Sequence, residues 1–276
     1  MKLALCNEVL RHLPFDEQCR LAAALGCSGL ELAPFTLADD PSTLTDADAR
    51  RLRGIAADHG LAISSLHWLL VRPEGLSISS ADAALHASTV AFLERMIGFA
   101  AACGAQVLVH GSPAQRSPAA GQSVADALAR SVAAWTALAA SAQRHGVTYC
   151  IEPLSPAETP VLNTVAEAAA VIERIGSPAV RTMLDLSAAS QAESEPPDRV
   201  LARYLASGHI AHVQLNDRNR RGPGQGDTPV APVLRALHAA GYGGWIALEP
   251  FDYHPDPIAC AAASAAYVRG ILEAIR

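Results

Sequence analysis

Residues 124–153 read VADALARSVAAWTALAASAQRHGVTYCIEP, and they contain a unit that recurs along the whole chain. The first part has the apolar periodicity of an amphipathic helix and stops at Gly146, a residue type that often ends helices in the left-handed conformation. A short apolar run at 148–152 follows and closes on Glu152. A helix followed by a continuously apolar strand is typical of a parallel sheet covered by helices.

This unit recurs about every 30 to 40 residues. Apolar runs that predict strands lie at 2–7, 28–33, 61–68, 106–110, 148–152, 180–185, 210–214 and 245–249. Helices are expected at 16–25, 46–59, 81–103, 124–145, 165–175, 199–206, 230–240 and 257–275. Eight such units in about 250 residues predict a closed (β/α)8 TIM barrel of the α/β class. An open doubly wound sheet is the alternative, which the lack of a G-x-G-x-x-G motif after the first run disfavours.

Composition narrows the class of protein. Half of the 276 residues are hydrophobic, 17% are charged and mean hydropathy is +0.19, which excludes a disordered chain. No Gly/Ser-rich or Pro-rich linker divides the sequence, so we expect one domain over residues 1–276. The 21 basic and 27 acidic residues give a net charge of −6 without a basic run, so we expect no nucleic-acid partner.

The sequence also bears on location. Polar residues interrupt every apolar block before about 18 residues, so no membrane span is expected. The first residues lack the apolar stretch of a signal peptide, and we therefore expect a cytoplasmic protein. The six cysteines form no C-x-x-C pair, which favours buried, reduced thiols over a disulfide framework or a metal cluster.

Polar residues end the last four predicted strands at Glu152, Asp185, Gln214 and Glu249. Closing the barrel would bring these ends to one rim, where the active sites of such barrels lie. Three carboxylates in one cleft repel one another unless a cation neutralises them. An all-oxygen ligand set suits Mn²⁺ best, with Mg²⁺ or Co²⁺ as alternatives. The competing interpretation is that these acids only cap strands and pair with arginines of the loop 216–227.

Earlier strands end in polar residues too. His67 and Trp68 close the third run, where an imidazole can bind a sugar hydroxyl and an indole can stack on the apolar face of a sugar. A hydrogen-bonded core histidine beside a packing tryptophan is the alternative. His110 ends the fourth run as a substrate contact or a structural cap. Asn7 and Glu31 close the first two runs, either as polar groups at the rim or as supports for it.

The loop at 216–227, NDRNRRGPGQGD, follows the seventh run. A glycine-rich loop with three arginines at this place in a barrel can bind a phosphate group. The alternative is that the glycines serve only to turn the backbone.

Several of these segments resemble one known family. The segments are Ile151-Glu152-Pro153-Leu154, Leu184-Asp185, Asn219-Arg220-Arg221, Pro223-Gly224-Gln225-Gly226 and Glu249-Pro250-Phe251. They look like the tagatose/psicose 3-epimerase branch of the xylose-isomerase-like TIM-barrel sugar isomerases and epimerases. The resemblance covers nearly the whole chain and is most specific in its second half.

The resemblance implies roles for individual residues. The family's four metal ligands match Glu152, Asp185, Gln214 and Glu249, and its acid/base pair matches the two glutamates of that set. Its substrate contacts match Glu158 and Arg220, and His110 lies in the segment that matches the loop before the site.

The chain departs from the family at two positions. Gln214 stands where the family has a ligating histidine, although its amide oxygen can ligate and related dehydratases use glutamine there. Ala188 stands where the family has a histidine that contacts substrate. Because a hexulose hydroxyl would lose a donor there, we expect poor activity on free tagatose, psicose and fructose compared with an oxidised, branched or cyclic polyol.

The leading hypothesis is a divalent-metal-dependent sugar isomerase or epimerase. Its two glutamates would move protons next to a carbonyl through a metal-stabilised enediolate. The alternatives are a metal-dependent dehydratase of a cyclic polyol or keto acid, and a barrel that binds sugar without catalysis. We expect a small sugar or polyol as substrate and a homodimer as the assembly.

Overall fold

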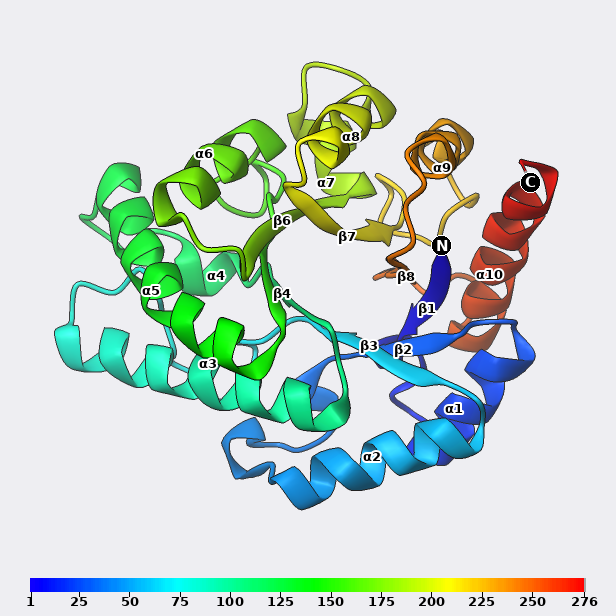
Figure 1. The fold of residues 1–276 in the computed structure, drawn as a ribbon, viewed down its shortest axis with the longest axis horizontal. Helices are drawn as coiled ribbons and strands as arrows, with labels where there is room; N and C mark the ends of the chain where they lie inside the picture. Colours follow the sequence, from blue (N-terminus) through cyan, green and yellow to red (C-terminus); the bar gives the residue numbers. More distant parts are fainter. Residues whose placement is uncertain (276) are drawn as a thin grey trace.

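The computed structural model describes residues 1–275 as a closed barrel of eight parallel strands, in which β8 pairs back with β1. Figure 1 looks along the barrel, with the strands at the centre and the helices around them. The strands are β1 (Lys2–Cys6), β2 (Gly29–Leu32), β3 (Ala62–Leu66), β4 (Val107–His110), β5 (Thr148–Ile151), β6 (Val180–Asp185), β7 (Ile210–Leu215) and β8 (Trp245–Leu248). The α-helices are α1 (Phe15–Ala24), α2 (Asp46–Asp58), α3 (Ala83–Cys103), α4 (Pro113–Arg116), α5 (Val124–His145), α6 (Val165–Ile175), α7 (Leu186–Ala192), α8 (Pro197–Ala206), α9 (Val230–Ala239) and α10 (Pro257–Ala274). Short 3₁₀ helices are η1 (Asn7–Leu10), η2 (Pro34–Thr36) and η3 (Pro41–Thr43).

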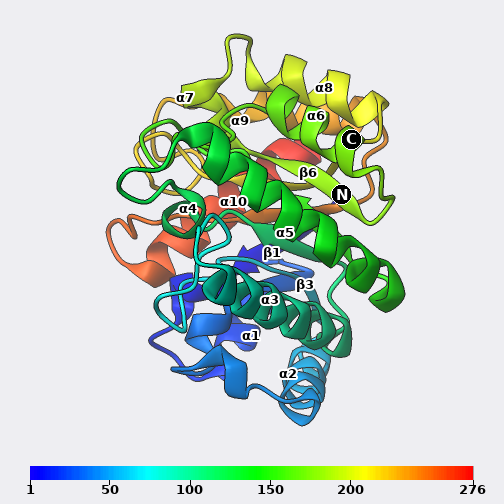
Figure 2. The ribbon, with the colours of Figure 1, turned by 90° about the vertical axis from the view of Figure 1, so that its left-hand side faces the viewer.

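The predicted barrel is therefore confirmed, strand by strand. Gly146 ends α5 with a φ of 67°, as its place in the sequence indicated. Helix α3 starts at Ala83, two residues later than predicted, because the Asp82 carboxylate accepts the N–H groups that open it. The long helices α3 and α5 pack side by side on the outside of the barrel (Figure 2).

Two α-helices after strand ends were not predicted, α4 and α7. Helix α7 begins directly after β6, because the Asp185 carboxylate accepts the N–H of Ala188 at 2.7 Å and caps the helix. A helix of this length has too few turns to show a periodicity in the sequence. It nevertheless forms part of the rim at the carboxyl ends of the strands.

The inside of the barrel changes from apolar to polar toward that rim. Successive residues of a strand face opposite sides, so Cys150 faces inward in the same sense as Glu152. Cys150 packs with Met183 and Val109 in a small apolar cluster within the barrel. The residues nearer the rim are polar and buried, and Glu31 is one of them.

All six cysteines are buried, and none of them forms a disulfide in the described residues 1–275. No helix within those residues is long and apolar enough to span a bilayer.

Candidate active site

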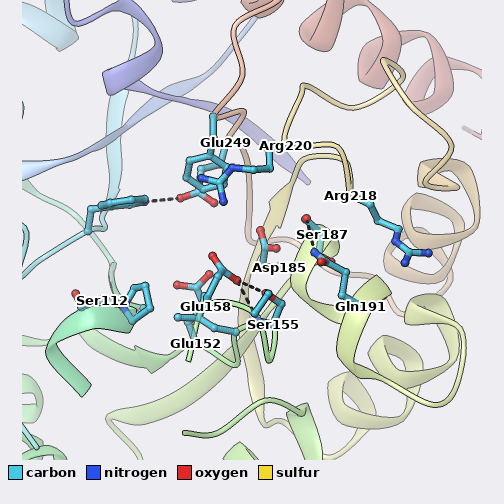
Figure 3. Close-up of a pocket in the computed structure, with 16 residues that line it drawn as sticks. Ser112, Glu152, Ser155, Glu158, Asp185, Ser187, Gln191, Arg218, Arg220 and Glu249 are labelled. Atoms are coloured by element: carbon cyan, nitrogen blue, oxygen red, sulfur yellow. Dashed lines mark hydrogen bonds between the residues drawn. The ribbon is translucent and has the colours of Figure 1, made fainter. Parts of the chain in front are cut away.

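Three carboxylates converge at the carboxyl ends of the strands. Glu152 follows β5, Asp185 ends β6 and Glu249 follows β8. One ligand oxygen from each lies within 4.8 Å of the others, and all three residues are buried. They line a cavity of about 250 Å³ and point toward one another across it (Figure 3).

The surrounding chain fixes each carboxylate differently. A Cβ atom at Gly111 would collide with the Glu152 carboxylate, so glycine at this position lets that carboxylate keep its place. Asp185 is held at both oxygens, by the N–H of Ala188 at 2.7 Å and by the side-chain amide of Asn216 at 2.7 Å.

Glu249 is held from one side only. Its Oε1 accepts hydrogen bonds from Nδ1 of His67 at 2.9 Å and from the indole of Trp68 at 3.2 Å. The other ring nitrogen of His67 donates to Glu8 at 2.9 Å, so the imidazole bridges two carboxylates. Burial would lower the pKa of His67, but Glu8 and Glu31 outweigh burial and raise that pKa well above its usual range.

Burial makes the three acids costly to ionise together. Burial is the largest cause that raises their pKa values, to about 7 for Asp185 and about 8 for Glu249. Burial also raises the pKa of Glu152 far above its usual range, helped by the other two carboxylates. A divalent cation between them would remove this penalty.

Gln214 supplies a fourth candidate ligand. It is fully buried next to Asp185 in the sheet register, and it is not one of the residues that line the cavity. Its Oε1 has no hydrogen-bond partner among residues 1–275. A buried carbonyl oxygen without a partner is costly unless something else binds it. The three carboxylates and this amide oxygen are therefore a ligand set that fits a hard divalent ion.

The rest of the cavity wall combines aromatic and charged groups. The rings of Trp68 and Phe251 lie 5.8 Å apart, and the guanidinium of Arg220 lies 4.6 Å from the Phe251 ring. Arg220 has a φ of 69°, a conformation that few non-glycine residues adopt. Glu158 lines the opposite wall, where its Oε2 accepts from the hydroxyl of Ser155 at 2.7 Å.

His110 does not reach the cavity. Its ring is fully buried and faces α5, with Nδ1 2.5 Å from the Tyr149 hydroxyl and 3.4 Å from the Trp135 indole nitrogen. Burial lowers its pKa to about 3, so the imidazole is neutral. The cause is strand alternation: Val109 faces into the barrel, and the next residue must face out. His67 is buried as well, but it contacts the site through Glu249.

Ser187 and Gln191 are among the polar residues on the cavity wall that the sequence did not indicate. They lie four residues apart on α7, and the Gln191 amide donates to the Ser187 hydroxyl at 3.1 Å. With Arg218 they form one side of the cavity (Figure 3). Ala188 lies between them in sequence but is buried and does not line the cavity. The i, i+4 spacing is the signal that could have found this pair.

The loop after β7 is held by internal hydrogen bonds and by a contact with the segment after β8. Asp217 accepts from the Thr228 hydroxyl at 3.0 Å, and Arg221 pairs with Asp252 at 2.9 Å. These contacts leave Arg218 and Arg220 as the loop arginines that line the cavity.

Known proteins resemble the chain over nearly its whole length. A family model described as xylose isomerase-like TIM barrel matches residues 19–271. D-psicose 3-epimerase of Agrobacterium fabrum is 29% identical over 86% of this chain and 79% of its own. L-ribulose 3-epimerase of Mesorhizobium japonicum is 30% identical over 82% and 72%.

Solved structures show the same fold. A structure of L-ribulose 3-epimerase has a TM-score of 0.85 over 100% of this chain and 95% of its own, at 24% identity. A structure of D-psicose 3-epimerase in the presence of D-fructose has a TM-score of 0.82 over 99% of both chains, also at 24% identity. The chain therefore belongs to the xylose isomerase-like TIM barrel family, and it is an enzyme of the isomerase and epimerase group within it.

Proposed function

We propose that this chain is a divalent-metal-dependent sugar epimerase that inverts a carbon next to a carbonyl group. One observation carries the proposal: three buried carboxylates converge within 4.8 Å at the wall of a cavity of about 250 Å³. Sites for drug-sized ligands measure about 300–1,000 Å³, so this cavity suits a monosaccharide or a small cyclic polyol. The resemblance to relatives named ketose 3-epimerases supports the same reaction class.

Glu152, Asp185, Glu249 and the amide oxygen of Gln214 would hold the ion. We expect Mn²⁺, with Mg²⁺ or Co²⁺ as alternatives, because the ligand atoms are all oxygens. When bound, the ion would polarise the substrate carbonyl and offset the repulsion among the carboxylates.

The two glutamates would move the protons. His67 and Trp68 both donate hydrogen bonds to Oε1 of Glu249, which leaves its Oε2 for proton transfer. Glu152 reaches the cavity from the end of β5, on another side. One carboxylate can then remove a proton from one face of the carbon while the other returns a proton to the opposite face.

Other side chains would bind the remainder of the sugar. Arg220 and Glu158 offer a donor and an acceptor on opposite walls, and the aromatic pair Trp68 and Phe251 offers a surface for the apolar face of a ring. We assign His67 to positioning Glu249, because the imidazole donates to that carboxylate. We leave His110 out of the substrate contacts, because the His110 ring faces α5.

Solvent deuterium exchange at the inverted carbon tests this function. With Mn²⁺ and a panel of ketoses and their oxidised, branched or cyclic derivatives, the wild type should incorporate deuterium at one carbon. We expect Glu152→Gln and Glu249→Gln each to lower exchange by about 10²–10⁴-fold, the range for loss of one acid/base group. Wild-type exchange in either variant would contradict the two-base mechanism. We also expect slower conversion of free tagatose, psicose and fructose than of the derivatives.

A dehydratase is the second candidate, and the buried amide of Gln214 favours it through the resemblance to dehydratases with glutamine there. Such an enzyme would start with the same proton removal and then expel a neighbouring hydroxyl group as water. Mass spectrometry of the product distinguishes them, because dehydration loses the mass of one water molecule and epimerisation loses none. The homodimer and the cytoplasmic location stay predictions, which light scattering and cell fractionation can test.

A further inference from the structure

Glu31 on β2 places a carboxylate in the middle of the barrel, where these barrels usually carry branched aliphatic side chains. The residue is fully buried. Five polar groups from other parts of the barrel surround it: Gln214 Nε2 at 2.6 Å, Cys6 Sγ at 3.2 Å, the Ser65 hydroxyl, His67 Nδ1 at 3.7 Å, and His212 Nε2, which approaches to 2.7 Å without hydrogen-bond alignment.

The contact with Gln214 crosses the barrel. The two residues lie on β2 and β7, which are not neighbours in the sheet. A carboxylate accepts hydrogen bonds and has none to donate, so the amide must turn its NH₂ group toward Glu31. The amide oxygen then faces the other way. That oxygen is one of the buried polar side-chain atoms that have no hydrogen-bond partner among residues 1–275.

We propose that Glu31 is a positioning residue that fixes the amide oxygen of Gln214 as a metal ligand. This inference rests on the proposed metal-dependent function. Carboxylates commonly orient ligating histidines through the second ring nitrogen, and here a carboxylate orients an amide through its NH₂ group. A hydrogen bond to a charged acceptor also polarises the amide, so its oxygen becomes a better ligand.

The consequence concerns the departure of this chain from its family. A lone glutamine would ligate less strongly than a histidine and could turn its NH₂ group toward the ion. With Glu31 behind it, Gln214 has one orientation and a more negative oxygen. The pair is therefore expected to act as a unit, so that each residue is useful only with the other.

Calorimetric titration with Mn²⁺ of the metal-free protein tests the pairing. Glu31→Gln keeps the shape of the side chain but removes its charge, and we expect an about 10–100-fold weaker Mn²⁺ affinity. In the Gln214→Glu background the same change should raise the affinity. There Glu31 would face another carboxylate, whereas a glutamine could donate to it.

This reversal of sign separates positioning from general damage to the interior. Ser65→Ala is the matched control, because Ser65 contacts the same carboxylate and does not contact Gln214; its affinity should equal that of the wild type. Co²⁺ absorption spectra provide a second measurement, since a lost amide ligand changes the bands of the bound ion. We expect Glu31→Gln to change these bands and Ser65→Ala to leave them unchanged.

Asp185→Ala distinguishes this inference from the proposed function. If the wild type binds Mn²⁺ and Asp185→Ala does not, the metal site stands. An unchanged affinity in Glu31→Gln, or equal losses in the wild-type and Gln214→Glu backgrounds, would then overturn the role of Glu31 alone. Absence of Mn²⁺ binding by the wild type would overturn both.

Discussion

Strands β5, β6 and β8 carry the carboxylates that face the cavity, whereas the elements around β1, β2 and β3 carry the side chains behind them. Asp185 and Glu249 belong to the first group, which we call the facing half, and both line the cavity. Glu8, Glu31 and His67 belong to the second group, which we call the supporting half, and none of them lines the cavity. The elements around β1, β2 and β3 therefore orient Glu249 and Gln214, whereas Asp185 is held by Ala188 and Asn216 on its own side of the barrel.

Removing a carboxylate from the facing half should have the largest effect. Asp185→Ala deletes a proposed ligand, so Mn²⁺ affinity should fall by more than the about 10–100-fold typical of an orienting partner. Calorimetry measures the affinity. Asp227→Ala, in the loop after β7, is the control and should bind Mn²⁺ like the wild type. Unchanged Mn²⁺ affinity in Asp185→Ala would show that the carboxylates of the facing half do not form the metal site.

A change in the supporting half should act on rate more than on binding. His67→Gln cannot bridge Glu8 and Glu249 as the imidazole does, so we expect kcat to fall about 10–100-fold with a smaller change in KM. Steady-state kinetics measure both constants. His110→Gln is the matched control, since His110 is equally buried and contacts no site carboxylate. An equal loss of kcat in both variants would show that burial, and not the bridge, matters.

The pH dependence of stability should reflect the raised pKa values of the carboxyl groups that face the cavity. Burial raises the pKa of Asp185 to about 7 and of Glu249 to about 8, against about 4 in an unfolded chain. These two carboxyl groups then bind more protons in the metal-free native state than in the unfolded state between about pH 4 and 8, so the stability that they contribute falls as pH rises through this window. Thermal unfolding across this range should show the fall.

Mn²⁺ should oppose this fall. The ion binds the ionised carboxylates, so the rise in Tm that it causes should grow with pH. A metal-free Tm that increases steadily from about pH 5 to about pH 8 would contradict the pKa shifts of the facing half.

The smallest effect is expected at the cavity wall on α7. Gln191→Ala removes one side-chain amide near the substrate, and a hydrogen bond of about 0.5–1.5 kcal/mol corresponds to an about 2–10-fold higher KM. Metal affinity should not change, because Gln191 contacts none of the proposed ligands. A lower Mn²⁺ affinity in this variant would show that the α7 side of the cavity affects metal binding, and would contradict the separation between ligands and substrate contacts.

The facing half could be predicted from the sequence for a simple reason. The runs before Glu152, Asp185 and Glu249 are mostly apolar, and the ends of successive parallel strands meet at one rim whatever the details of packing. The orientation of His110 could not be predicted, because the run 107–110 is apolar on both faces up to the histidine. Helix α7 was missed because it is too short for a periodic pattern.

The supporting contacts were beyond the sequence for another reason. Glu31 and Gln214 are separated by 183 positions and meet only because the barrel closes. Their pairing depends on register and on the direction of each side chain, and neither is written in the local pattern of residues. The sequence indicated both residues as polar strand ends but not that they touch.

Asp185 caps α7 and is also a proposed ligand, and this double use has a consequence for how such an enzyme can diverge. The helix that starts at Asp185 presents Ser187 and Gln191 to the cavity, at two and six positions further along. New side chains at those two positions would alter which substrates fit, while the capping bond to Ala188 keeps the ligand in place. Selectivity can therefore change within two helical turns of the proposed metal site without a change in the chemistry.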